Sequence, residues 1–290
     1  MIGWIVAFLA AVGARLAHGA GVRREQLRQH ALRAFTADGI VVGAEGFTLR
    51  GTNGRGMLLL HGSGDTPQSL RYLAGRLHDA GYTVHAPLLP GHGRDVAYFS
   101  SVTALDYAAA AETALDTLLR EVTRVSVGGL SMGGALAARL VADRPEPDAL
   151  VLLAPYLEAP SSVKWAVRTA RAWGLAIPFV AGRGDRSVHD PVAAAEGMAY
   201  GVFSPAGLRA MLTSARAGRL ALARVRVPTL VVHSREDNRI PLAIAERSTT
   251  TLRAHTERHW VAGCGHVITV DHCKARVAEL VLDFLARHGA

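Results

Sequence analysis

Three residues of this sequence have the types and the order needed for nucleophilic catalysis by a serine, and the first of them is Ser131. It is the centre of Gly-Leu-Ser-Met-Gly at residues 129–133, which fits the pattern Gly-x-Ser-x-Gly. In a nucleophile elbow the serine occupies a strained strand-to-helix turn, and the flanking glycines leave room for the backbone to pass close by. β-Branched valines precede the pattern and an alanine-rich run follows it. Because this order is that of strand, turn and helix, we expect an elbow rather than a chance match in a chain with 30 glycines.

A serine hydroxyl is a poor nucleophile near neutral pH, so Ser131 would need a histidine as its base and a carboxylate to orient that histidine. Asp237 follows an apolar run at 229–233, and His266 lies in a glycine-flanked loop after the next expected strand. We expect Asp237 to be the acid and His266 to be the base. Glu236 competes with Asp237, although loop position favours Asp237. The other candidate bases lie within expected strands or on an expected helix: His233, His259 and His272.

Acyl transfer through a serine also needs hydrogen-bond donors for the oxyanion. The backbone N–H of Met132 follows the nucleophile directly and is one expected donor. The second is expected from the His-Gly-Ser-Gly turn at residues 61–64, where the glycines permit a tight turn that aims the N–H of Ser63 inward. Because both donors are backbone groups, the side chain of Ser63 matters less than its placement.

The elements that must position these residues follow from alternating apolar runs and amphipathic patterns. Strands are expected at 40–42, 47–49, 57–61, 82–86, 124–127, 149–154, 229–233 and 258–261. Helices are expected at 68–80, 102–121, 132–143, 241–249 and 271–288. Strands that alternate with helices of these lengths predict an α/β fold with a mostly parallel, doubly wound sheet.

The alternation stops in residues 156–222, which we expect to be a helical cap insertion without strands. Helices are expected there at 163–173, 192–199 and 205–217. The aromatic residues of the insertion could form a small core of their own or line an apolar acyl pocket. The catalytic domain would then consist of residues 39–155 and 223–290.

Residues 1–38 form a separate N-terminal segment whose first 14 residues carry no charge. Three interpretations stay open: a membrane anchor through residues 1–22, an amphipathic or packed helix, and a cleaved signal. With an anchor, the arginines after the apolar run would place the catalytic domain in the cytoplasm. A soluble cytoplasmic enzyme and a secreted one are the alternatives.

Composition excludes some classes of function. The formal net charge is +8 and the pI about 10.2, but the cations form no long basic run, so we expect no nucleic-acid partner. Cys264 and Cys273 are nine positions apart and suggest neither a disulfide framework nor a zinc site, and Cys264 is expected to be a small packing residue. No metal or organic cofactor is expected, and the oligomeric state cannot be read from the sequence.

Five motifs together resemble those of the α/β-hydrolase superfamily, and the similarity is greatest to bacterial carboxylesterases and monoacylglycerol lipases. They occur in the family's order at residues 60–64 (LHGSG), 90–93 (PGHG), 129–133 (GLSMG), 237–241 (DNRIP) and 265–271 (GHVITVD). The resemblance covers about residues 40–155 and 223–288, and neither the N-terminal segment nor the cap insertion is part of it. It implies the α/β-hydrolase fold with Ser131 as nucleophile, Asp237 as acid, His266 as base, and Ser63 and Met132 as oxyanion donors.

The expected function is that of a serine ester hydrolase acting on small carboxylic esters with apolar acyl chains, such as monoacylglycerols, through an acyl-enzyme intermediate. Thioesterase and amidase or peptidase activities use the same machinery and stay as alternatives. An alternative of another class is a non-catalytic, membrane-associated binding protein. The complete set of catalytic residue types favours the enzyme.

Overall fold

The computed structural model describes residues 32–170, 180–181 and 187–289, together with isolated positions between Trp4 and Arg28. Most of the expected N-terminal segment therefore lies outside the described residues. So do the end of the helix expected at 163–173 and two aromatic residues of the insertion, Trp173 and Phe179.

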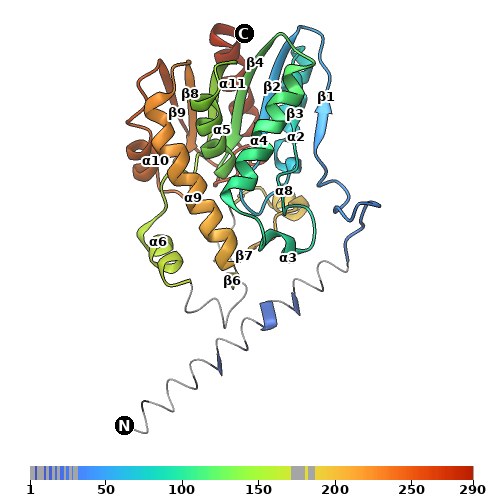
Figure 1. Ribbon diagram of the computed structural model, residues 1–290, viewed down its shortest axis with the longest axis vertical. Helices are drawn as coiled ribbons and strands as arrows, with labels where there is room; N and C mark the ends of the chain where they lie inside the picture. The colour runs from blue at the N-terminus through green and yellow to red at the C-terminus, as the bar shows by residue number, and fades with distance from the viewer. Residues whose placement is uncertain are drawn as a thin grey trace.

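The described residues form a seven-stranded sheet in the order β1-β3-β2-β4-β5-β8-β9 (Figure 1). All neighbouring strands are parallel except β1, which runs antiparallel to β3. The strands are β1 (Phe47–Leu49), β2 (Arg55–Leu60), β3 (Thr83–Ala86), β4 (Arg124–Leu130), β5 (Pro147–Leu153), β8 (Thr229–Ser234) and β9 (Thr256–Val261). The predicted mostly parallel, doubly wound sheet is confirmed. The strand expected at 40–42 is wrong, because Val41 makes only an isolated bridge to Phe35.

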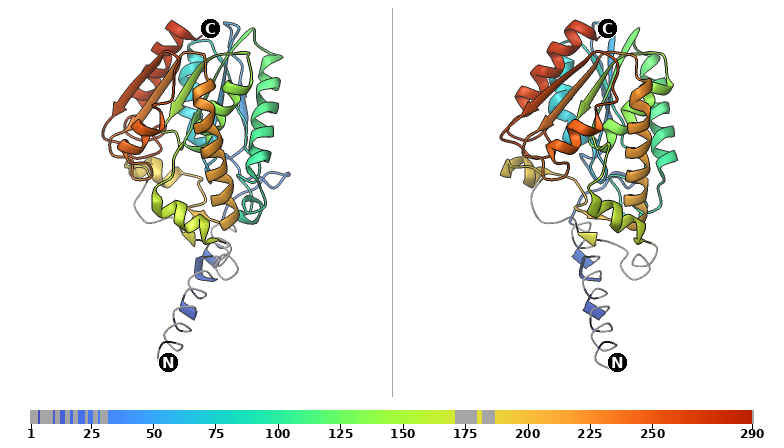
Figure 2. Two further views of the ribbon diagram at one scale, coloured as in Figure 1. Left: turned by 60° about the vertical axis from the view of Figure 1, so that its left-hand side comes forward. Right: turned by 90° about the vertical axis from the view of Figure 1, so that its left-hand side faces the viewer.

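Helices cover both faces of the sheet and give the molecule three layers (Figure 2). One face is covered by α2 (Arg71–Asp79) and α11 (Lys274–His288). The other face is covered by α4 (Ala104–Leu119), α5 (Met132–Asp143), α9 (Pro205–Ala221) and α10 (Leu242–Ser248). The short elements α3 (Val96–Phe99), η1 (Pro67–Leu70) and η2 (Leu222–Arg224) lie in the connections.

The two cores explain why the central strands appear as continuous apolar runs. In β2, Leu58 and Leu60 pack in the core beneath α4 and α5, whereas Met57 and Leu59 pack in the core beneath α2 and α11. All four side chains are fully buried. Each buried side chain of this size contributes roughly 1.5–3 kcal/mol of hydrophobic stabilisation, so the central strands firmly fix the sheet edge from which the site loops emerge.

The insertion contains helices and also a small sheet. Before α9, its described elements are α6 (Ser161–Arg168), β6 (Val180–Ala181), α8 (Pro191–Glu196) and β7 (Val202–Phe203), and Figure 1 shows them near one end of the large sheet, opposite the C-terminus. The strands β6 and β7 pair antiparallel, so the expectation of an insertion without strands is wrong. Two-residue strands are too short to show an alternating pattern in the sequence.

The last helix of the insertion, α9, packs directly against α5. A Cβ added to Gly218 would lie 2.4 Å from the carbonyl oxygen of Ala135, so the two backbones are in close contact. A glycine at this position of α9 therefore lets the insertion's final helix become part of the core on that face of the sheet.

Within the part of the chain that the structure describes, no helix combines the length and the apolar character needed to cross a membrane.

Candidate active site

Ser131 occupies a sharp turn between β4 and α5. Its backbone lies in the left-handed region with φ 56° and ψ −118°, a conformation that costs a non-glycine residue on the order of 1–3 kcal/mol. A Cβ on Gly133 would lie 2.0 Å from the carbonyl oxygen of Leu60, and a Cβ on Gly129 would lie 2.2 Å from the carbonyl carbon of Gly133. The two glycines of the motif are thus required by backbone packing, as the elbow predicts.

The structure brings Ser131, Asp237 and His266 into one hydrogen-bonded chain. The His266 ring has its Nε2 atom 2.9 Å from the Oγ atom of Ser131 and its Nδ1 atom 2.7 Å from the Oδ2 atom of Asp237. Because a carboxylate only accepts hydrogen bonds, Nδ1 carries the proton and Nε2 is left to accept from the serine hydroxyl. All three residues are buried. This arrangement allows proton transfer from Ser131 to His266.

Backbone donors and a second histidine hold the Asp237 carboxylate. Its Oδ1 atom accepts hydrogen bonds from the N–H groups of Arg239 at 2.7 Å and Ile240 at 2.8 Å. Burial raises the pKa of Asp237, but the charge and the hydrogen bond of His266, together with the nearby His233 and the Ile240 N–H, outweigh it and hold the pKa below its ordinary value. Asp237 is therefore ionised at neutral pH and can stabilise a charged His266 ring.

His233, a rejected candidate for the base, lies beside this carboxylate. Its Nε2 atom donates to the carbonyl oxygen of Ile240 at 2.9 Å and lies 3.4 Å from the Oδ2 atom of Asp237. Burial lowers the pKa of His233, so the ring is neutral. It supports the acid and does not face Ser131.

The other rejected candidates lie outside the hydrogen-bonded chain. The half-exposed carboxylate of Glu236 accepts from the N–H of Gly263 at 3.0 Å and so holds a neighbouring turn. His259 is on β9 near Glu257, with 38% of its side chain exposed, and His272 is exposed.

Two buried histidines shape the loop that carries Ser63. The Nδ1 atom of His61 donates to the carbonyl oxygen of Gly62 at 2.9 Å, and its Nε2 atom accepts from the N–H of Leu89 at 3.0 Å. The Nε2 atom of His92 accepts from the N–H of Gly64 at 2.9 Å. Burial lowers the pKa of His61 well below its ordinary value and that of His92 to about 4. Both rings are neutral at pH 7 and act as fixed hydrogen-bonding supports.

The two expected oxyanion donors belong to residues next to Ser131, one in the chain and one in a neighbouring loop. Met132 is the first residue of α5, where backbone N–H groups have no partner within the helix. Ser63 follows Gly62, whose Cβ, if present, would lie 3.3 Å from the Cβ of Ser131. The Ser63 hydroxyl is buried without a hydrogen-bond partner among the described residues, which agrees with a role for its backbone rather than its side chain.

Two residues near the site were missed by the sequence interpretation. Asp65 follows the turn at 61–64 directly, and its carboxylate accepts from the hydroxyl of Ser69 at 2.6 Å. Burial raises the pKa of Asp65 to about 6, although hydrogen bonds from the Ser69 hydroxyl and the Thr66 backbone N–H partly oppose this. Tyr200 of the insertion donates its N–H to the carbonyl oxygen of Gly64 at 2.8 Å. The position of Asp65 beside the turn was its only signal. Tyr200 is one of the insertion's aromatic residues, but nothing in the sequence indicated its backbone contact with Gly64.

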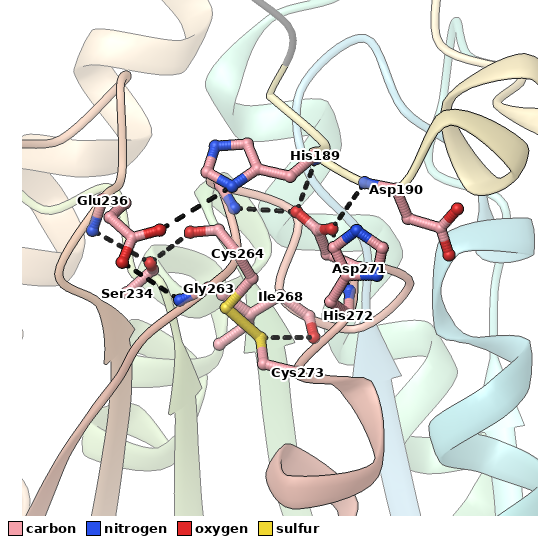
Figure 3. The surroundings of a disulfide bond; sticks show 11 residues. His189, Asp190, Ser234, Glu236, Gly263, Cys264, Ile268, Asp271, His272 and Cys273 are labelled. Carbon is pink, nitrogen blue, oxygen red and sulfur yellow. Dashed lines mark hydrogen bonds and ion pairs between the residues drawn. A yellow bond between two sulfur atoms is a disulfide. The ribbon is translucent and has the colours of Figure 1, made fainter.

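The expectation of two unpaired cysteines is wrong, because Cys264 and Cys273 form a disulfide with a Cα–Cα distance of 5.8 Å (Figure 3). The helix expected from residue 271 begins at Lys274, and the turn before it brings Cys273 back to the loop of His266. A separation of nine positions gives no direct information about this distance in space.

One group of side chains in the described part of the chain could hold a metal ion: His255, Glu257 and His288. The Glu257 carboxylate is already paired with Arg287 through two contacts of 2.8 and 3.0 Å. We therefore assign this group to charge pairing on the surface and not to the chemistry of Ser131.

Residues 57–280 match the alpha/beta hydrolase family, and the chain belongs to that family. The match includes the elbow, the loop of Ser63 and the loops of Asp237 and His266.

Curated relatives and solved structures agree with this assignment. A thermostable monoacylglycerol lipase of Bacillus sp. (strain H-257) is 29% identical over 236 residues, which cover 81% of this chain and 91% of the lipase. A pimeloyl-[acyl-carrier protein] methyl ester esterase of Aromatoleum aromaticum (strain DSM 19018 / LMG 30748 / EbN1) is 30% identical over 257 residues, covering 78% of this chain and 97% of the esterase. A solved structure reported with LipS and LipT, two metagenome-derived lipolytic enzymes, has a TM-score of 0.78 at 28% identity, covering 86% of this chain and all of that one. The chain is thus an alpha/beta hydrolase that resembles lipases and esterases.

Proposed function

We propose that this protein is a serine hydrolase that cleaves carboxylic esters with apolar acyl chains through an acyl-enzyme intermediate. The observation that carries the proposal is the hydrogen-bonded chain from Ser131 through His266 to Asp237, in a family whose relatives include lipases and esterases.

The geometry supports a two-step reaction. The Oγ atom of Ser131 attacks the ester carbonyl carbon while Nε2 of His266 takes its proton, and the N–H groups of Ser63 and Met132 stabilise the oxyanion. His266 then protonates the leaving alcohol, which departs and leaves the acyl group on Ser131. A water molecule, deprotonated by His266, releases the acid. Asp237 keeps His266 in the required tautomer and stabilises its charged form.

We place the apolar acyl chain in a pocket formed partly by helices of the insertion, whose lining is half apolar and half charged. It has a volume of about 280 Å³ and lies between α6, α9 and the chain segment that follows β5. Its lining residues are Leu157, Glu158, Ala159, Lys164, Leu212, Ala215, Arg216 and Arg219. The segment after β5 is tied to the nucleophile, because the N–H of Tyr156 donates to the carbonyl oxygen of Ser131 at 2.9 Å. Monoacylglycerols and similar small lipid esters are the proposed substrates, as the name of the Bacillus relative suggests.

Labelling with a fluorophosphonate tests the nucleophile. We expect the wild-type protein to be labelled and to hydrolyse p-nitrophenyl octanoate. The variant Ser131→Ala should show no labelling and a loss of roughly 10⁴-fold or more in kcat, since the whole catalytic unit depends on the serine oxygen. The variant Ser126→Ala is a suitable control, because Ser126 is a buried serine on the same strand, β4. Folded wild-type protein that stays unlabelled would instead support the non-catalytic binding protein.

Membrane association is a second part of the proposal. The apolar residues 1–22 support a contact with lipid, and Trp4 is 84% exposed. The Cys264–Cys273 disulfide supports an exported catalytic domain over a cytoplasmic one, because disulfides persist mainly in oxidising compartments.

A further inference from the structure

The carboxylate of Asp271 is fully buried and accepts four hydrogen bonds from backbone N–H groups. Its Oδ2 atom accepts from His189 at 2.8 Å and Gly265 at 2.7 Å, and its Oδ1 atom accepts from Asp190 at 2.9 Å and His272 at 2.8 Å. Burial raises the pKa of Asp271, but these four donors together outweigh it and hold the pKa below its ordinary value. The group is therefore an ionised anchor inside the protein.

These donors belong to two segments that are far apart in the sequence (Figure 3). Gly265 is the residue before His266, and His272 follows Asp271 itself. His189 and Asp190 lie in residues 187–190, which precede α8 and which we call the return segment of the insertion. Each carboxylate oxygen binds one N–H from the return segment and one from the loop of His266, so Asp271 joins the two.

Further contacts hold the return segment against the loops of the site. The N–H of Val267 donates to the carbonyl oxygen of Ser187 at 3.0 Å, and the side chain of Arg239 donates to the Ser187 hydroxyl at 2.6 Å. A Cβ on Gly265 would lie 2.6 Å from the Ser187 carbonyl oxygen, so only glycine fits there without a shift. The return segment thus contacts the loops of both Asp237 and His266.

The disulfide closes the loop that contains both His266 and Asp271. The carbonyl oxygen of Cys264 also accepts a hydrogen bond from the Ser234 hydroxyl at the end of β8. The base therefore lies on a loop fixed to the sheet at one end and to the return segment through Asp271.

We propose that Asp271 is a positioning residue, which holds the loop of His266 in a fixed position against the return segment of the insertion. The inference rests on the proposed role of His266 as the base. Asp271 keeps His266 in line with Ser131 and, through the same carboxylate, fixes the position of the insertion beside the catalytic loops. Its loss should slow acylation, and should slow it more for long acyl chains than for acetate.

The variant Asp271→Asn tests this role with little change in shape. An amide has only one accepting oxygen, so one N–H of the return segment and one of the His266 loop lose their acceptor whichever way the amide points. We expect fluorophosphonate labelling of Ser131 to slow roughly 10- to 100-fold per folded molecule, the effect of a small misplacement of a catalytic group. The ratio of kcat/KM for p-nitrophenyl octanoate to that for acetate should also fall. The control is Asp283→Asn, an exposed carboxylate on α11, which should stay within about twofold of wild type.

The measurements separate positioning from mere stability. Rates are expressed per active site titrated by the probe, so a partly unfolded sample lowers the number of sites and not the rate per site. A wild-type rate per site and a wild-type octanoate-to-acetate ratio in Asp271→Asn would overturn the proposal.

A second variant decides the case if Asp271→Asn does not fold. Ser187→Ala removes one contact of the return segment and leaves the carboxylate in place, and it should lower the octanoate-to-acetate ratio roughly 2- to 10-fold, the range for one hydrogen bond. An unchanged ratio in that variant would overturn the proposal. If wild-type protein hydrolyses no ester, the proposed function fails, but the labelling rates still report whether Asp271 positions His266.

Discussion

The pKa values of two carboxylates near Ser131 are shifted in opposite directions. Asp237 has two backbone donors and His266 as partners, and its pKa is held below the ordinary value in spite of burial. Asp65 has one hydroxyl partner, Ser69, and burial raises its pKa to about 6. At pH 7 Asp237 is firmly ionised, whereas Asp65 changes its charge at about pH 6.

The raised pKa of Asp65 predicts a specific dependence of stability on pH. The folded protein binds the proton of Asp65 more tightly than the unfolded chain does, so this residue stabilises the fold at low pH and the contribution is lost as pH rises from about 4 to about 6. The variant Asp65→Asn should lack this loss. Between pH 4.5 and pH 7.5, its unfolding free energy should therefore rise relative to that of wild type by on the order of 1–2 kcal/mol. Urea unfolding at the two pH values measures it. The exposed Glu112→Gln is the control and should follow wild type, and an Asp65→Asn variant that also follows wild type would contradict the assigned burial.

Residue types and local order were enough to single out Ser131, Asp237 and His266, which the structure brings together, because each lies in a short motif beside a strand end. The sequence could not predict Asp65 or the four-fold anchoring of Asp271, since both depend on burial and on segments up to 82 positions away. It also could not predict the disulfide, which depends on a turn before α11. Partners that are distant in the sequence leave no local pattern.

At the scale of elements, the site loops follow the parallel strands β2, β4, β5, β8 and β9, which therefore deliver their residues to one edge of the sheet. Most of the long strands could be predicted because they contain a shorter apolar run, such as residues 57–60 in β2 and 149–153 in β5. The strands β6 and β7 could not, because two residues show no period. The packing of α9 on α5 depends on the contact between Gly218 and Ala135, which no helical pattern reveals.

The pocket between α6 and α9 predicts which substitution would change the preference for the length of the acyl chain. Leu212 lines it and is only partly buried, so the variant Leu212→Trp should fill the pocket without disrupting the core. We expect kcat/KM for p-nitrophenyl octanoate to fall roughly tenfold or more, because burying a chain of several methylenes contributes about 0.8 kcal/mol for each. Hydrolysis of p-nitrophenyl acetate should change little. Leu220→Trp is the control on the same helix, because Leu220 is 67% exposed. Equal losses for acetate and octanoate would show that the acyl chain binds elsewhere.

At the scale of the whole molecule, a catalytic domain with a net positive charge is joined to an apolar N-terminal segment. The formal charge of the whole chain, +8, favours attraction to anionic lipid, and the apolar residues of the segment offer groups that can enter it. Neither feature alone gives stable binding, since a surface charge is screened by salt and a short apolar segment is a weak anchor. Together they predict binding that depends on both lipid charge and a few apolar side chains.

Vesicle sedimentation tests this combination with two exposed tryptophans of the chain. Trp4 is 84% exposed in the N-terminal segment, and Trp165 is 69% exposed on α6 of the insertion. The full-length protein should sediment with anionic phospholipid vesicles at low salt and much less with neutral ones. Trp4→Asp should weaken binding roughly tenfold or more, since burying an apolar side chain of this size is worth about 1.5–3 kcal/mol, and should leave p-nitrophenyl acetate hydrolysis unchanged. Trp165→Asp is the matched comparison and should bind as wild type does if the N-terminal segment supplies the lipid contact. The reverse result would place the lipid contact on the insertion, and binding that survives both changes would attribute it to charge alone.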